Sequence, residues 1–417
     1  MDTVVLRSRA RTALIAVVLG ATAGLASAAY LGLVQLLERL VWDHGEPRLG
    51  LPAAVAIPVT TVAGGVVVGM VRRRHDADSP HDLGDVLNGL DVVIEDPEPT
   101  GPPKVSWLVR SALLGVVSLG FGASLGPEAP LIALAAGLGQ RMARLLTLTT
   151  TEGAYLSASG AVSGLFGGPL GAAALPVDGS HGRTGRALLP YALLAALAGF
   201  VTMVAALPGE AGERFVLPVH EIVEGRAALG SLGWATVVAV PATTAGLAII
   251  GLSRWLRSTL TGVVPSAVVR AALGGLVLGL CGAASHLVIF SGHHQGQDLI
   301  DLAPAGWTAA GIAGLKVAAT VACLSTGWFG GQIFPGIFTG MAVGLAVAAW
   351  CPAAPAAVLV AAGAGATCVA MLRKPLAAVL ILLLFFPASS LLALTTGAAL
   401  AAAIVHLLGE RAPIPEH

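Results

Sequence analysis

Long apolar stretches recur along the chain and are separated by short polar segments. Several of them contain Gly-Gly or proline, which predicts short, tilted or broken helices. The pattern therefore predicts an all-α polytopic membrane protein with a single transmembrane domain over residues 1–417, of which 406–417 form a short tail. The stretches long enough to cross or nearly cross a bilayer are 12–35, 51–71, 186–207, 231–252, 264–290, 307–325, 353–371 and 376–405.

The basic residues indicate an orientation in the membrane. Arg7, Arg9 and Arg11 precede the first apolar stretch, and "RRRH" (72–75) follows the second. One crossing out and one back brings both clusters to the same face, which the positive-inside rule makes cytoplasmic. The first stretch continues past any plausible cleavage site, so it predicts a membrane helix and not a removed leader. We expect a multi-pass protein of a prokaryotic inner membrane with a cytoplasmic N-terminus.

The composition agrees with a membrane protein: 56% of the residues are hydrophobic and 11% are charged. A soluble chain carries about a quarter charged residues. The formal net charge is zero, so no nucleic-acid partner is expected. No nucleotide loop, nucleophilic triad or metal-ligand cluster occurs, and the chain is expected to be no enzyme and to hold no cofactor or metal. The cysteines are expected to be small lipid- or core-facing residues: Cys281, Cys323, Cys351 and Cys368.

Three short sequence elements occur twice, in the same order and at similar offsets. Such a repetition predicts two homologous halves, about 12–205 and 230–405. Duplicated membrane proteins of this kind are typically transporters or channels with an ion site at the interface between the repeats. The paired elements are the G-x3-G-x3-P patterns at 122–130 and 327–335, the small-residue runs at 157–175 and 360–380, and "HDLGD" (81–85) with "HQGQD" (294–298).

The first of these pairs predicts two helix starts. Pro127 and Pro130 fit the first turn of a helix, where a missing N–H does no harm, and "GGQIFPGIFTG" (330–340) has the same form. A helix N-terminus offers unpaired N–H groups and partial positive charge. Two converging N-termini would hold an anion without any basic side chain.

Glu128 lies between these prolines in an otherwise uncharged run, 122–139. A carboxylate is costly there, and ionisable groups inside membrane segments are typically functional. We expect Glu128 to act as a gate: ionised, it is a tethered anion that competes with a diffusing one, and protonation frees the site. The alternative is an ordinary helix-start acid that interacts with the helix dipole.

At these residues the sequence resembles the CLC family of chloride channels and chloride/proton antiporters. Its G-[RK]-E-G-P stretch corresponds to "GPEAP" (126–130), with Glu128 on the gating glutamate, and its G-x-F-x-P stretch to "GQIFP" (331–335). The resemblance implies a CLC-type fold of two inverted-topology repeats with broken, tilted helices, and a homodimer with one pore per subunit. The anion-binding residues that it implies are Gly126, Ala129, Gln332, Ile333 and Phe334, with the last three acting through backbone N–H groups.

The chain also departs from the family pattern. Pro127 replaces the usual basic residue, and the family's coordinating serine falls in "SPHDLGDVL" (79–87), where His81 or Ser79 is the candidate substitute. The family's coordinating tyrosine is absent. The inner proton-relay glutamate of the antiporters falls at Gly179, beside Asp178. Asp178 is thus a candidate proton acceptor, and the alternative is a solvated loop acid.

Other polar residues have candidate roles at the membrane surface or in the pore. His81 and His294 either tune an anion site or are loop histidines at the membrane surface. Lys316, Arg373 and Lys374 are expected to be interfacial or snorkelling cations and not pore residues.

The sequence therefore predicts selective transport of a small inorganic anion, chloride first, by a voltage-gated chloride channel-like protein or a chloride/proton antiporter. One alternative is a fluoride exporter of the same fold, because that branch also departs at the serine and inner-glutamate positions. An alternative of another class is a non-transporting membrane homologue that binds a partner. The intact Glu128 argues against the latter.

Overall fold

The chain folds into helices, as its apolar pattern predicts. The structure, a computed structural model, describes residues 2–43, 46–73, 83, 86, 102–174, 183–208, 214–217 and 226–409. Within this part of the chain, eight helices are long and apolar enough to cross a membrane. The strands described are two short ones, β1 (Trp42–Asp43) and β2 (Glu46–Pro47), which form an antiparallel hairpin between α1 and α2.

The two halves contain corresponding helices. The first half comprises α1 (Asp2–Val41), α2 (Ala53–Arg72), α4 (Val105–Gly120), α5 (Glu128–Leu146), α6 (Thr150–Phe166), α7 (Pro169–Ala174) and α8 (Arg183–Ala206). The second comprises α9 (Arg226–Val263), α10 (Ala267–Ala284), α11 (His293–Leu302), α12 (Gly306–Thr326), α13 (Ile333–Trp350), α14 (Ala356–Leu372), α15 (Pro375–Phe385) and α16 (Leu391–Leu408). Two short 3-10 helices, η3 (His286–Val288) and η4 (Ala388–Ser390), belong to the second half.

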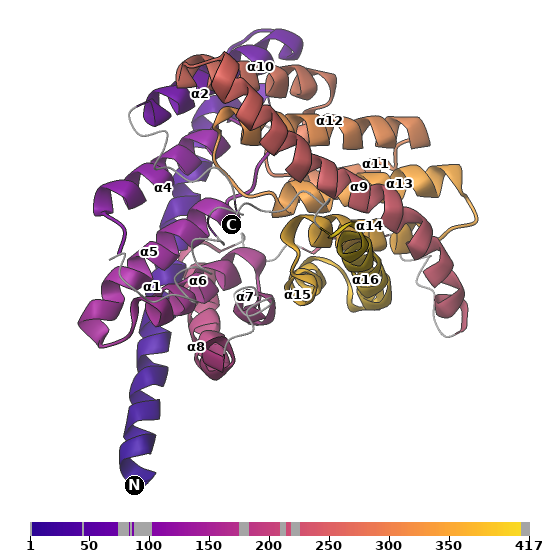
Figure 1. The fold of residues 1–417 in the computed structure, drawn as a ribbon. Helices are drawn as coiled ribbons and strands as arrows, with labels where there is room; N and C mark the ends of the chain where they lie inside the picture. The colour runs from indigo at the N-terminus through magenta and orange to yellow at the C-terminus, as the bar shows by residue number, and fades with distance from the viewer. Residues whose placement is uncertain are drawn as a thin grey trace.

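The same packing recurs in both halves. Helix α1 packs against α8 and α9 against α16, whereas α5 packs on α6 and α13 on α14. Figure 1 shows the first half on the left and the second on the right, with α2 and α10 together at the top. The predicted fold of two inverted-topology repeats is thus confirmed.

Glycines allow the corresponding helix pairs to approach closely. A Cβ atom on Gly139 of α5 would collide with the carbonyl oxygen of Gly153 on α6. In the second half, a Cβ on Gly340 of α13 would collide with the carbonyl oxygen of Gly363 on α14. Small residues at equivalent positions therefore bring the backbones together in both repeats, as is common in membrane helix packing.

The apolar run at 376–405 is not one helix. Helix α15 ends at Phe385, Phe386 is extended, and α16 begins only at Leu391. Pro387 explains the break, since proline lacks an N–H and disfavours a helical residue before it. Helix α13, by contrast, is a candidate span that the sequence analysis did not single out.

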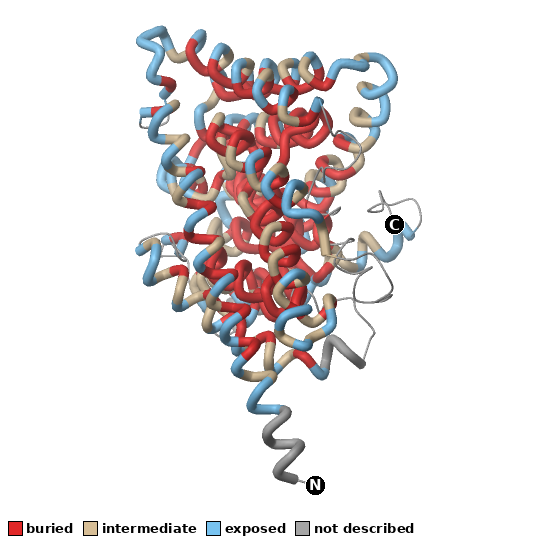
Figure 2. The backbone as a smooth tube through the Cα atoms, turned by 90° about the vertical axis from the view of Figure 1, so that its left-hand side faces the viewer, coloured by how far each residue is buried: buried red, intermediate tan, exposed pale blue. Residues whose placement is uncertain are grey.

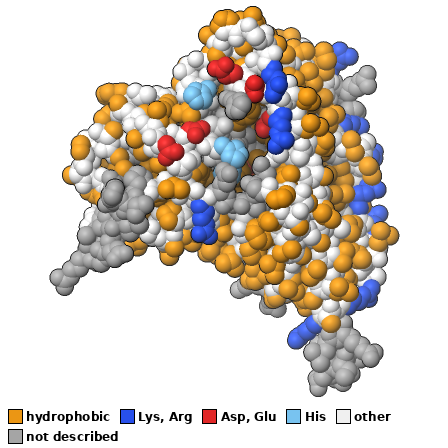
Figure 3. Space-filling model, turned by 180° about the vertical axis from the view of Figure 1, so that it is seen from behind, with side chains coloured by type: hydrophobic (Ala, Val, Ile, Leu, Met, Phe, Trp, Pro, Cys, Tyr) orange, Lys and Arg blue, Asp and Glu red, His pale blue; other side chains and the backbone are white. Residues whose placement is uncertain are grey.

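The molecule has a buried interior and a largely hydrophobic outer surface. Buried residues run through the centre of the molecule and exposed ones lie on its outside (Figure 2). Much of the outer surface is hydrophobic, while Asp, Glu and His side chains gather in one area of the face in Figure 3. Cys281, Cys323 and Cys368 are buried and Cys351 is half-buried. Within the described residues, three charged side chains are nevertheless fully buried among apolar helices: Arg72, Glu128 and Lys316.

Candidate functional site

Glu128 is the first residue of α5 and is fully buried. Pro127 caps the helix, and its carbonyl accepts the Leu131 N–H at 3.1 Å. Pro130 lies in the first turn, where its missing N–H breaks no helical hydrogen bond. The two prolines thus help to start a helix whose free N-terminal end lies in the middle of the protein.

The start of α13 meets the start of α5 from the other half of the chain. Gly126 and Gly331 form an isolated antiparallel bridge with two backbone hydrogen bonds, each 2.7 Å long. These are the corresponding glycines of the duplicated pattern. Equivalent positions of the two sequence repeats are therefore in direct contact in the structure.

The Glu128 side chain crosses this bridge to the N-terminus of α13. Its Oε1 atom accepts the N–H of Ile333 at 2.7 Å and the N–H of Phe334 at 3.3 Å. Its Oε2 atom is buried and has no hydrogen-bond partner in the described part of the chain. The carboxylate thus occupies a cradle of backbone amides at a helix start, which is the donor set that suits a small anion.

Glycine is required on both sides of this carboxylate. A Cβ atom on Gly126 or on Gly331 would collide with the carboxyl group of Glu128. The cradle is therefore closed tightly around the side chain, and its space is set by two glycines from different repeats.

The N–H of Gly126 donates to Gly331 in this conformation. The anion-binding roles of Gly126, Ala129 and Gln332 stay predictions. The Oε1 atom of the Gln332 side chain accepts a hydrogen bond from the N–H of Leu83 at 3.3 Å. Ala129 is buried next to Glu128 in the first turn of α5.

Two predicted residues, His81 and Asp178, lie outside the described residues, as do Ser79 and Gly179. Leu83, from the segment in which the coordinating serine was expected, is described and buried. Its N–H donates to the Gln332 side chain, so Leu83 lies at the start of α13.

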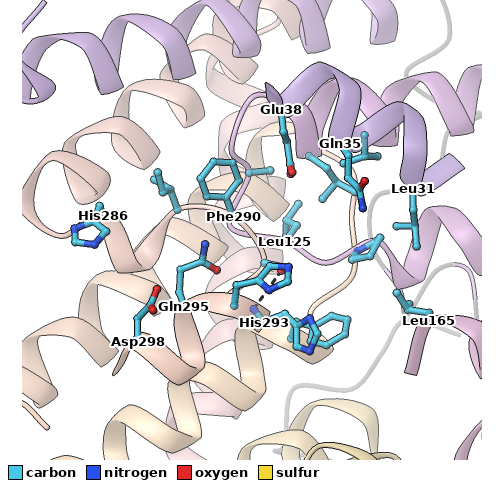
Figure 4. Close-up of a pocket in the computed structure, with 18 residues that line it drawn as sticks. Leu31, Gln35, Glu38, Leu125, Leu165, His286, Phe290, His293, Gln295 and Asp298 are labelled. Carbon is cyan, nitrogen blue, oxygen red and sulfur yellow. Dashed lines mark hydrogen bonds between the residues drawn. The ribbon is translucent and has the colours of Figure 1, made fainter. Parts of the chain in front are cut away.

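A chamber of about 390 Å³ leads from the surface to this site. Its inner wall includes Pro127 and Phe334, which adjoin Glu128 and one of its hydrogen-bond donors. Figure 4 shows Glu38 on α1 and His293, Gln295 and Asp298 on α11 around the space. Glu128 itself is not among the lining residues, but it directly follows Pro127 and accepts the N–H of Phe334, so it adjoins the chamber.

His293 is a lining residue that sequence reasoning missed. Its ring is half-buried and lies 5.0 Å from the ring of Phe334 and 5.2 Å from that of Phe385. Its neighbour His294, the predicted candidate, also lines the chamber and is exposed. Adjacent residues on a helix face different directions, so the doublet "HH" alone could not show which imidazole lies nearer Phe334.

Lys316 is the clearest disagreement with the sequence analysis. It was expected to snorkel to an interface, but it is fully buried in α12. Its Nζ donates to the carbonyl oxygens of Phe290 at 2.8 Å and Val288 at 3.2 Å. The side chain ends inside the protein because those two carbonyls, and not water, accept its hydrogen bonds.

A family model described as voltage gated chloride channel matches residues 88–406. The ion-transport protein YfeO of Salmonella schwarzengrund is 29% identical over 382 residues, covering 84% of this chain and 85% of that protein. YfeO of Escherichia fergusonii is 28% identical over 376 residues, with 85% and 84% covered.

Solved structures share the fold. The crystal structure of a CLC-type fluoride/proton antiporter has a TM-score of 0.75 and 18% identity, and 94% of each chain is covered. That of a slow cyanobacterial Cl⁻/H⁺ antiporter has a TM-score of 0.76 and 18% identity, with 97% of this chain and 96% of the other covered. The similarity extends over nearly the whole chain, so it concerns the complete arrangement of both repeats.

Proposed function

This chain belongs to the family of voltage gated chloride channels, and on that premise we propose that it carries a small inorganic anion past a gate formed by Glu128. One observation above all supports the proposal: the Oε1 atom of Glu128 is bound by the N–H groups of Ile333 and Phe334. The gate is thus an anion held in an anion site that the opposite repeat builds.

The mechanism is competition for the amides. While Glu128 is ionised, its carboxylate satisfies the N–H groups at the start of α13 and closes the inner end of the chamber. Protonation removes the negative charge and weakens both hydrogen bonds, since charge-assisted bonds are the stronger ones. A diffusing anion then takes the place of the carboxylate at the helix N-terminus. One residue in this way gates an anion and binds a proton.

The proposed anion is chloride, in keeping with the family. Fluoride is the second candidate, because one of the similar structures is a fluoride/proton antiporter. This chain also lacks the family's serine and inner glutamate at the expected positions, as that branch does. Backbone N–H groups at a helix start suit either halide, and the relative fluxes of chloride and fluoride distinguish the two candidates.

Proton coupling is the second open choice within the family. An antiporter must pass the proton from Glu128 to the opposite side, and Asp178 is the candidate acceptor there. A passive channel needs no such acceptor. The similar structures described as proton antiporters favour coupling as the first hypothesis to test.

We further propose that the chamber opens to the outside of the cell. Helix α1 starts at its basic end, with Arg9 and Arg11, and reaches the chamber at Glu38. Helix α2 returns and ends at Arg72. The positive-inside rule puts the basic ends in the cytoplasm, and thus the chamber on the other face. The homodimer implied by the family resemblance remains a prediction.

Flux from proteoliposomes that hold the purified full chain tests this function. Chloride moved uphill by a proton gradient would establish antiport, and chloride moved only downhill would favour a channel. Fluoride flux far above chloride flux would replace chloride by fluoride. If correctly folded protein moves neither halide under any gradient, the transport proposal is wrong, and the partner-binding homologue becomes the better hypothesis.

A further inference from the structure

The positive charge of Lys316 has no use in the mechanism described so far. The residue lies in the candidate span Gly306–Thr326 and is fully buried. Its Nζ forms no ion pair with any carboxylate in the part of the chain that the structure describes. A buried ammonium inside a membrane protein is costly, and such residues usually mark an ion pathway.

The contacts of Lys316 spread its charge but do not cancel it. Two backbone carbonyls, of Val288 and Phe290, accept hydrogen bonds from Nζ. The ring centroid of Phe338 lies 5.0 Å from the same nitrogen, a cation–π arrangement. Carbonyl dipoles and an aromatic face carry no net charge, so they leave the charge of the protonated ammonium group uncancelled.

This charge lies directly behind the chamber wall. Val288 ends η3, Phe290 lies between η3 and α11, and Ile289 and Phe290 line the chamber. The N–H of Phe290 donates to the carbonyl of Gly122 at 3.0 Å, in the segment that leads to Glu128. Figure 4 shows Phe290 in the chamber wall below Glu38. One layer of backbone thus separates the ammonium group from the space outside the gate.

We propose that Lys316 supplies the positive charge that concentrates anions in the chamber outside Glu128, an inference that rests on the proposed function. The chamber also carries the acidic side chains of Glu38 and Asp298, which repel anions. A charge behind a low-dielectric wall acts strongly on a neighbouring cleft and raises the local concentration of counter-ions. Lys316 offsets the acidic groups without presenting a side chain that would hold the anion in place.

A mechanical role is the competing explanation: Lys316 could serve only to hold the turn at 288–290. The two roles respond differently to substitution. Lys316→Gln keeps a side-chain N–H donor for a turn carbonyl but removes the charge, whereas Lys316→Met removes both. If the charge matters, the two variants behave alike. If only the hydrogen bonds matter, Lys316→Gln resembles the wild type.

Arg270 provides a matched control. It too is buried and donates to two backbone carbonyls, of Val264 and Pro265, at 2.9 and 3.1 Å. It lies in the first turn of α10, next to the α2 end that carries Arg72, and is not among the chamber residues. Arg270→Gln therefore removes a buried cation of the same kind at a distance from the chamber.

The experiment measures the initial rate of halide flux against halide concentration for the full chain in proteoliposomes. For Lys316→Gln and Lys316→Met we expect the half-saturating concentration to rise about tenfold, with a maximal rate close to that of the wild type. Arg270→Gln should keep the wild-type half-saturating concentration, even if its melting temperature falls.

A wild-type concentration dependence in folded Lys316→Gln would overturn the inference, as would an equal rise in Arg270→Gln. Either result can occur while the wild-type protein transports normally. Absence of halide flux in the wild-type protein would instead contradict the proposed function itself. The two failures are therefore distinguishable in one set of liposomes.

Discussion

At the scale of single residues, two acids at helix starts show how environment sets a role. Glu152 on α6 forms a capping box with Thr149: each side chain is hydrogen-bonded to the backbone N–H of the other residue, at 2.9 and 3.1 Å. Glu128 also begins a helix, but its carboxylate bonds to a different helix, at Ile333 and Phe334. Glu152 is thus an ordinary helix-start acid, the alternative role considered for Glu128. Glu128 instead connects the two repeats.

Substitution of Gly331 tests how tightly the cradle holds the gate. In Gly331→Ala the new Cβ atom would collide with the Glu128 carboxyl group, so the side chain must leave the amides. We expect faster halide flux at neutral pH and a weaker dependence on pH, measured in proteoliposomes. Gly314→Ala is the control, because a Cβ there meets no atom within 4 Å. Equal flux in Gly331→Ala and the wild type would contradict a cradle that the carboxylate must vacate.

The sequence could predict those site residues that belong to local motifs. Glu128 was predicted because a charge in an apolar run is visible without a structure, and Ile333 and Phe334 were implied by the family resemblance of a short local motif. Lys316 and His293 were not predicted, because their roles depend on distant segments. The carbonyls that receive Lys316 are in a turn between other helices, and His293 lies against Phe385 of α15.

At the scale of elements, breaks in the helices matter as much as the helices. The interruption before α13 was predicted from its glycines and Pro335, and this break creates the N-terminus that binds Glu128. The interruption at Pro387 was not located, because several apolar runs contain proline and Pro58, Pro190 and Pro241 lie inside helices. Hydropathy indicates whether a segment prefers the membrane to water, but it does not show where a helix breaks within the membrane.

The contact between α2 and α10 should be sensitive to side-chain size. A Cβ atom on Gly275 of α10 would collide with the carbonyl of Thr61 on α2. Gly275→Val should therefore destabilise the protein by about 1–3 kcal/mol, the usual cost of overpacking. The check is a lower melting temperature in detergent. Gly311→Val, on an exposed position of α12 with no atom within 4 Å, should melt like the wild type; equal melting of both variants would contradict the close packing.

At the scale of the whole molecule, the two repeats make one site that neither contains alone. The first repeat provides the acid and the second provides the amides, with the Gly126–Gly331 bridge between them. The duplication was predictable from the sequence, whereas the contact between its equivalent glycines depends on how the repeats face each other. The fold itself agrees with the CLC-type antiporter structures over nearly the whole chain.

The proposed orientation predicts which surface positions face outward. Leu49 and Val263 are both exposed. Leu49 shortly precedes the start of α2, and Val263 shortly precedes the start of α10, which packs against α2. The two positions belong to opposite ends of this helix pair. In a Cys351→Ala background, a membrane-impermeant maleimide added to intact cells should label Leu49→Cys and leave Val263→Cys unlabelled until the cells are opened. The reverse pattern would contradict a cytoplasmic N-terminus.

The pH dependence of halide efflux in Glu128→Gln tests the gate most directly. Lowering the pH protonates Glu128, so wild-type flux should rise as the pH falls. Glutamine carries no charge at any pH, so the variant should be fast throughout and nearly independent of pH. Glu152→Gln, the helix-start control, should keep the wild-type profile. A Glu128→Gln protein whose flux follows pH as the wild type does would contradict the proposal that the Glu128 carboxylate is the gate.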